Sequence, residues 1–274
     1  MTAGFSVVKR CAASSPFAGL GSSHRTARGA PDGLDADPNP SASLVCRGNE
    51  GERMFIGHYG PAAAVAGSRV KLWHGFVAVQ FLDILWAPAI LTGVEKVRIV
   101  ERFTASNHFD LYHMPYTHSL LMAGVWSVIA GGLYALVRRQ AGVIGGIIIG
   151  ALVFSHWLLD FVTHKPDLAL WFGGPKVGLG LWENRPLAVS AEFAFVVAGF
   201  AIYLARTSAR GAGGTLSLAL LFVLMAVAQL IGNFGPPPGS PNEAAYSAIG
   251  SYVVFAALAA WVDATRDVKS APKA

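Results

Sequence analysis

Long apolar runs, separated by short polar segments, divide most of the chain into stretches that could cross a bilayer. Spanning takes about 20 mostly apolar residues. The runs of that length predict six spanning helices, at about 72–93, 118–137, 141–164, 186–206, 215–234 and 244–264. A further helix at about 55–67 is too short to span. Gly and Pro fall at nearly every boundary, as helix ends favour. The pattern therefore predicts an all-α, polytopic membrane bundle.

Composition supports this fold class and sets the two ends of the chain apart. Hydrophobic residues make up 53% of the 274 and charged residues 14%, whereas soluble domains average about 25% charged residues. Residues 1–53 are rich in Ser, Ala, Gly and Arg, and predict a disordered tail or sequence upstream of the true start at Met54. A helical membrane domain is expected over 54–266, followed by a short polar tail over 267–274.

The distribution of Lys and Arg predicts the orientation. Loops at one end of the predicted helices hold nine: Arg69, Lys71, Arg138, Arg139, Arg206, Arg210, Arg266, Lys269 and Lys273. Loops at the other end hold six: Lys96, Arg98, Arg102, Lys165, Lys176 and Arg185. The end with more positive charge is expected in the cytoplasm, and the expected location is a bacterial inner (plasma) membrane. Basic loops also account for the net charge of +5 without a nucleic-acid partner.

The segment FSHWLLDFVTHK places three ionisable residues in an apolar helix. His156, Asp160 and His164 are four residues apart and so share one helix face. At the helical rise, the two histidines are roughly 12 Å apart with the aspartate between them. That is too far for both histidines to bind one ion. It suits a carboxylate shared by two ions, or one site at His156 and Asp160 with His164 facing another.

Ionisable groups are expensive in a membrane helix and normally face a partner or a water-filled cavity. The helix map brings His58, Asp83 and His118 to the same membrane face, and Glu192 enters its helix from that face. His74 lies near the opposite end. The body of the chain has no thiolate, because Cys11 and Cys46 both lie in the N-terminal tail. A site of His and Asp alone suits zinc, with manganese or iron as alternatives.

Four motifs in this order resemble those of the membrane-bound metal-dependent hydrolases, distant relatives of the zinc-dependent phospholipases C. They are GHYG with His58, QFLDILWAP with Asp83, YTHSLL with His118, and SHWLLDFVTH with His156, Asp160 and His164. The resemblance spans about 54–205. It implies that these residues hold catalytic metal and that Asp160 bridges or anchors it.

The expected function is hydrolysis of a phosphoester, with a membrane lipid or membrane-associated molecule as substrate and metal-bound hydroxide as nucleophile. Glu192 is a candidate catalytic residue and, with His164, a candidate for a second metal site. His113 is a candidate for proton transfer, although His108 and His113 lie in a polar loop and are expected to be solvated. Loop 165–185 suits an interfacial segment or a lid. Two alternatives stay open: a proton or metal-ion transporter that uses the same residues, and a catalytically silent scaffold.

Overall fold

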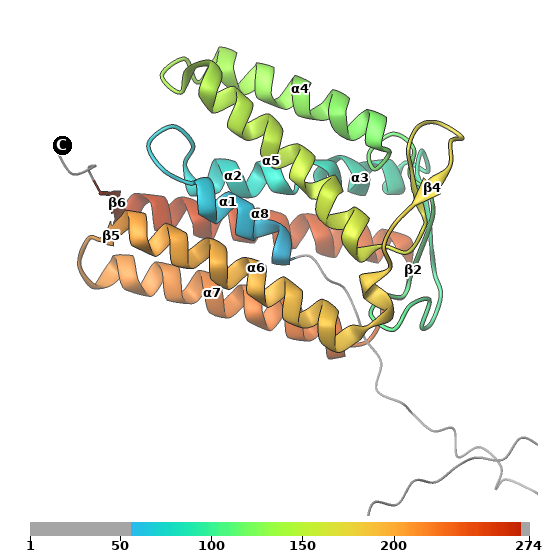
Figure 1. Ribbon diagram of the computed structural model, residues 1–274. Helices are drawn as coiled ribbons and strands as arrows, with labels where there is room; N and C mark the ends of the chain where they lie inside the picture. Colours follow the sequence, from blue (N-terminus) through green and yellow to red (C-terminus); the bar gives the residue numbers. More distant parts are fainter. Residues whose placement is uncertain (1–55, 270–274) are drawn as a thin grey trace, which may run out of the picture. The chain divides into compact units, whose positions relative to one another are not determined.

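The computed structural model describes residues 56–269 as a helical bundle (Figure 1). The helices are η1 (Ile56–His58), α1 (Tyr59–Val65), α2 (Leu72–Val79), α3 (Phe81–Leu91), α4 (Leu120–Val137), α5 (Gly142–Thr163), η2 (Leu181–Glu183), α6 (Arg185–Arg206), α7 (Gly211–Phe234) and α8 (Pro241–Thr265). The predicted all-α, polytopic bundle is confirmed. The predictions for residues 1–53, for both cysteines and for the last five residues lie outside the described residues.

Five helices, α4 to α8, are each long and apolar enough to cross a membrane. The pair α2 and α3 forms a sixth candidate span, bent by 48° at a break. The number of spans thus agrees with the sequence pattern, but the continuous helix predicted over 72–93 is wrong. The chain leaves the helical conformation at Gln80 (φ −104°, ψ 9°), whose side chain is fully buried. Interrupted backbone at membrane depth is tolerated where protein surrounds it.

Helix α1 is short, and it lies directly on α6. Neither Gly60 nor Gly199 has room for a Cβ, because each would collide with the backbone of the opposite helix. Only glycine allows two helix backbones to approach so closely. This contact holds η1, which precedes α1 and contains His58, against the middle of α6.

The described polar segments contain three small antiparallel strand pairs that the hydropathy pattern did not predict. They pair β1 (Lys96–Ile99) with β2 (Phe109–His113), β3 (Leu168–Ala169) with β4 (Lys176–Val177), and β5 (Thr207–Ala209) with β6 (Arg266–Val268). The first hairpin packs against the bundle, so the prediction of a solvated His108 is wrong. His108 is buried, and its Nδ1 accepts a hydrogen bond from the Arg102 N–H (2.8 Å).

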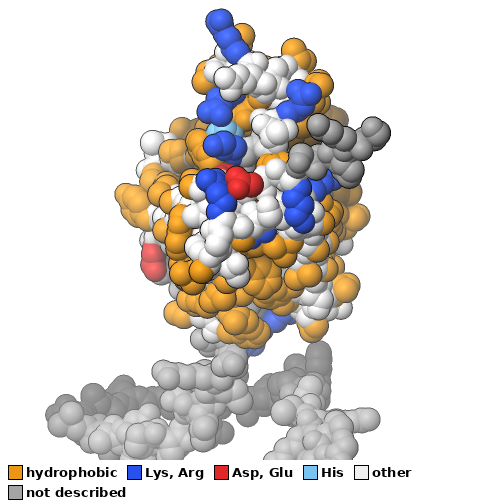
Figure 2. Space-filling view, turned by 90° about the vertical axis from the view of Figure 1, so that its left-hand side faces the viewer, with side chains coloured by type: hydrophobic (Ala, Val, Ile, Leu, Met, Phe, Trp, Pro, Cys, Tyr) orange, Lys and Arg blue, Asp and Glu red, His pale blue; other side chains and the backbone are white. Residues whose placement is uncertain are grey.

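The two ends of the bundle differ in charge and in structure. Strands β5 and β6 and the α4–α5 turn lie at one end, and β2 and β4 lie at the other (Figure 1). Figure 2 looks onto the first end. Lys and Arg side chains lie mainly in the upper half of this view, and hydrophobic side chains cover the sides and the lower half. Large aliphatic side chains such as Val128, Val137 and Val143 are more than 70% exposed on the sides of α4 and α5. Apolar exposure on this scale fits contact with lipid.

Candidate metal centre

Six side chains from distant parts of the chain meet at the end of the bundle away from β5 and β6. They are His58 of η1, Asp83 of α3, His118 just before α4, His156 and Asp160 of α5, and His164 at the end of α5. All are buried except Asp83, whose side chain keeps 20% of its surface exposed. Their place near the start of α4 and the end of α5 puts the cluster toward one end of these two candidate spans.

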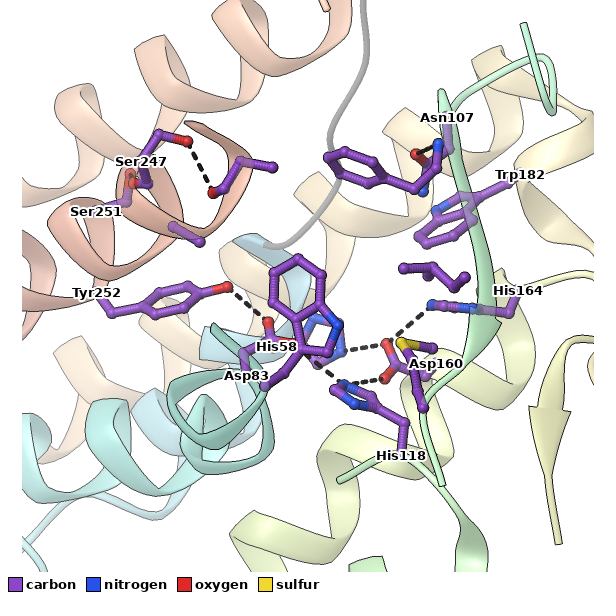
Figure 3. A pocket seen from close by; sticks show the side chains of 16 residues that line it. His58, Asp83, Asn107, His118, Asp160, His164, Trp182, Ser247, Ser251 and Tyr252 are labelled. Atoms are coloured by element: carbon purple, nitrogen blue, oxygen red, sulfur yellow. Dashed lines mark hydrogen bonds and ion pairs between the residues drawn. The ribbon is translucent and has the colours of Figure 1, made fainter. Parts of the chain in front are cut away.

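Asp160 lies at the centre of this cluster. Its Oδ1 is 3.1 Å from Nε2 of His58 and 3.7 Å from Nε2 of His164. Its Oδ2 is 3.1 Å from Nε2 of His156 and 3.7 Å from Nε2 of His118. Figure 3 shows His58, His118 and His164 pointing toward Asp160. The two oxygens of one carboxylate therefore face two separate sets of histidines.

Asp83 adds a second carboxylate to the group of side chains around Oδ2 of Asp160. Its Oδ1 is 3.2 Å from Nε2 of His118 and 3.6 Å from Nε2 of His156. One atom each from Asp83, His118 and His156 lie within 4.8 Å of one another, as do atoms of His58, His156 and Asp160. The cluster therefore offers two adjoining positions for a metal ion, and Asp160 and His156 lie between them.

Two histidines have a second ring nitrogen next to a group that can only accept a hydrogen bond. Nδ1 of His156 is 2.6 Å from the Val79 carbonyl oxygen. Nδ1 of His164 is 2.9 Å from the Asp167 carboxylate. Because neither oxygen has a proton to donate, Nδ1 must carry the proton in both rings. In the neutral ring this leaves a lone pair on Nε2.

His118 is held in the same tautomer through a longer chain of hydrogen bonds. Its Nδ1 is 2.7 Å from the Thr117 hydroxyl, which lies 2.6 Å from Oε2 of Glu95. The other oxygen of Glu95 accepts the backbone N–H groups of Tyr116 (2.8 Å) and Thr117 (2.9 Å). Since the carboxylate can only accept, Thr117 donates to Glu95 and accepts the proton of His118 Nδ1.

These assignments direct three imidazole lone pairs at carboxylate oxygens inside the protein. Oδ2 of Asp160 is buried and has no hydrogen bond in the described part of the chain. Lone pairs facing one another repel unless a cation lies between them. Divalent cations between the imidazoles and the carboxylates would remove this repulsion and leave the imidazoles neutral. The donor set therefore fits a divalent metal, and nitrogen and oxygen ligands suit zinc, manganese or iron.

The partner of His164 also changes its basicity. Burial acts to lower the pKa of His164, but the adjacent Asp167 carboxylate and its hydrogen bond raise that pKa above the ordinary value for histidine. A carboxylate behind a ligating imidazole fixes the ring orientation and strengthens the nitrogen as a ligand. Asp167 thus supports His164 as Glu95 supports His118.

A cavity of about 110 Å³ opens beside the cluster. The cluster side chains of His58, Asp83, His118, Asp160 and His164 form one wall. Helix α8 contributes another wall, with the hydroxyls of Ser247, Ser251 and Tyr252 (Figure 3). The remaining lining is largely apolar and comes from Trp86, Phe109, Leu111, Met114 and Trp182, together with Asn107.

Glu192 and His113, the two candidate catalytic residues, lie outside this cavity. The Glu192 carboxylate accepts a hydrogen bond from the Gly57 N–H, directly behind His58. His113 is exposed on β2 and lines a second cavity of about 270 Å³, which shares Met114 and His118 with the first. Their catalytic roles stay predictions. His74 lies at the other end of the bundle, with its Nδ1 2.9 Å from the Tyr134 hydroxyl.

Several residues of the site had no place in the sequence analysis: Glu95, Thr117, Asp167 and Tyr252. Thr117 and Asp167 are close in sequence to a predicted ligand, so a search for partners beside each histidine would have found them. Glu95 and Tyr252 reach the site only through the fold. No protein-family model, curated protein or solved structure matches the chain.

Proposed function

We propose that the protein is a membrane-embedded, metal-dependent hydrolase that cleaves a phosphoester at one membrane surface. The observation that supports this most strongly is the position of Asp160, whose two oxygens face separate groups of histidines. A shared carboxylate is a usual way to hold two metal ions close together. Two such ions, when bound, would lower the pKa of a water molecule and polarise a phosphoryl oxygen.

In this proposal the protein's own residues bind the metal, orient its ligands and shield the cluster from water. His118, His156 and His164 present Nε2 because Nδ1 of each ring is engaged elsewhere. Asp83 and Asp160 supply the negative charge that retains a divalent cation. The apolar wall limits the water that reaches the cluster, which strengthens every electrostatic interaction inside.

The proposed substrate class is a lipid phosphoester or another membrane-associated phosphoester. The cavity lies where the spanning helices end, and its lining is mostly apolar. None of the described residues that line it is Lys or Arg. The charge of a phosphoester would therefore have to be balanced by bound metal. A bacterial inner membrane as the location stays a prediction.

Metal content is the first test. Detergent-purified wild-type protein should contain at least one equivalent of zinc, manganese or iron by elemental analysis. The His156→Gln and Asp160→Asn proteins should lose the metal, because each substitution replaces a metal-binding atom of the cluster. His74→Gln is the matched control: it changes a buried histidine at the other end of the bundle and should keep the metal. A wild-type protein that stays metal-free after reloading with excess ion would overturn the proposal.

Activity then separates the proposed hydrolase from its alternatives. Metal-loaded protein should release a product from a mixed panel of phospholipids, and chelation should abolish the release. Stability loss on chelation, with no turnover of any phosphoester, would support the silent scaffold. Ion or proton flux through wild-type proteoliposomes, lost in Asp160→Asn, would support the transporter.

A further inference from the structure

Helix α8 reaches the cluster through one hydroxyl group. The Tyr252 hydroxyl donates a 2.7 Å hydrogen bond to Oδ2 of Asp83, 169 residues earlier in the chain (Figure 3). The other oxygen of the same carboxylate, Oδ1, faces Nε2 of His118 and Nε2 of His156. The two oxygens of Asp83 thus have different partners: one faces the phenol and the other faces the metal position.

This division matters for how Asp83 could bind a cation. A carboxylate binds a metal through one oxygen or through both. A phenol that donates to Oδ2 engages one of the two lone pairs of that oxygen and fixes the rotation of the carboxylate about its Cβ–Cγ bond. Only Oδ1 is then directed at the cluster.

We propose that Tyr252 is a positioning residue of the metal centre, which holds Asp83 as a one-oxygen ligand. The inference rests on the proposed function, since it requires that the cluster binds metal. It extends the site to α8, a helix that supplies none of the six clustered side chains. Tyr252 also lines the cavity, so its ring borders the space that a substrate would occupy.

The hydroxyl is needed for this contact, whereas the ring would pack equally well without it. Tyr252 is buried, with 9% of its surface exposed, and Phe would fill nearly the same volume. Ser247 and Ser251, on the same face of α8, donate to carbonyl groups of their own helix. The Tyr252 hydroxyl instead crosses from α8 to α3. Residues that orient a metal ligand from behind typically contribute about 10–100-fold to metal affinity.

The test compares Tyr252→Phe with Tyr246→Phe. Tyr246 lies on the same helix, is 65% exposed and does not line the cavity. Tyr246→Phe removes a hydroxyl from the same helix and is therefore the matched control. Zinc affinity is measured by competition with a chromophoric chelator. The visible absorption of cobalt-loaded protein reports the coordination number. Tyr252→Phe should bind zinc about 10–100-fold more weakly and change the cobalt spectrum. Tyr246→Phe should match the wild type in both.

A double variant distinguishes positioning from a general loss of structure. If Tyr252 acts through Asp83, then adding Tyr252→Phe to Asp83→Asn should reduce zinc affinity no further. Additive losses would overturn the inference, as would a Tyr252→Phe protein with wild-type affinity and spectrum. The wild-type measurement separates the two proposals. Absence of zinc, manganese and iron binding there would overturn the metal centre itself, whereas zinc binding that is unchanged in Tyr252→Phe would overturn the role of Tyr252 alone.

Discussion

Replacing Glu95 with Gln should weaken metal binding, although Glu95 is not among the proposed ligands. Oε1 of Glu95 accepts two backbone N–H groups, and Oε2 accepts the Thr117 hydroxyl. Glutamine has one acceptor oxygen and one donor nitrogen in these places. If the glutamine oxygen accepts the two backbone N–H groups, the glutamine nitrogen must donate to the Thr117 hydroxyl. The Thr117 hydroxyl then turns toward Nδ1 of His118, and the imidazole proton moves to Nε2, the atom that faces Asp83.

The opposite orientation of the amide does not avoid the loss. Its oxygen would then accept from Thr117, but its nitrogen would face the N–H groups of Tyr116 and Thr117. Leaving such a buried group unsatisfied costs about 1–3 kcal/mol. We therefore expect Glu95→Gln to lower zinc affinity by about 10–100-fold, which corresponds to about 1.4–2.8 kcal/mol.

Chelator competition on detergent-purified protein measures this change, and Thr117 offers the controls. Thr117→Ser keeps the hydroxyl and should bind zinc as the wild type does. Thr117→Val removes the acceptor for His118 and should weaken binding in the same direction as Glu95→Gln. A folded Glu95→Gln protein with wild-type zinc affinity would refute the assigned direction of the hydrogen bonds from Glu95 to His118.

Two further substitutions probe the supports of His58 and His164. Gly57→Ala should destabilise the protein by about 1–3 kcal/mol, because the new Cβ would lie 2.7 Å from Oε2 of Glu192. Denaturant unfolding in detergent measures the stability, and Gly213→Ala is the control because a Cβ added there meets no other atom. A Gly57→Ala protein as stable as the Gly213→Ala protein would contradict the prediction. Asp167→Asn should lower zinc affinity by up to about tenfold, since an amide supports His164 less strongly than a carboxylate. Calorimetric titration with zinc measures this affinity, and Asp267→Asn, at an exposed aspartate, is the control. A wild-type zinc affinity in Asp167→Asn as well as in the control would contradict the prediction.

The clustered side chains were accessible to sequence reasoning because ionisable groups are rare in apolar helices. His156, Asp160 and His164 have helical spacing, and counting residues from the helix ends placed His58, Asp83 and His118 at the same membrane face. Length and hydropathy were enough for the spans themselves. These inferences use only local periodicity and the thickness of the bilayer.

The orientation of the same side chains was not accessible in this way. Glu95 is polar and follows a predicted helix, so composition assigns it to a solvated loop, whereas the β1–β2 hairpin buries it against Thr117. Tyr252 lies in a run that hydropathy describes completely as a membrane helix. Its bond to Asp83 depends on how α8 packs against α3. Contacts between residues so distant in sequence are set by tertiary packing.

The break at Gln80 connects the path of the backbone to the chemistry of the site. In a continuous helix, the Val79 carbonyl would accept the N–H of Asp83, four residues later. The break instead leaves this carbonyl at the end of α2, where helix carbonyls have no partner within the helix. Nδ1 of His156 donates to it, which satisfies a buried acceptor and directs the lone pair of Nε2 at Asp83 and Asp160. A straight helix over 72–93 would remove the acceptor that fixes this tautomer. The interruption that hydropathy could not predict is therefore part of what makes the cluster suited to a metal ion.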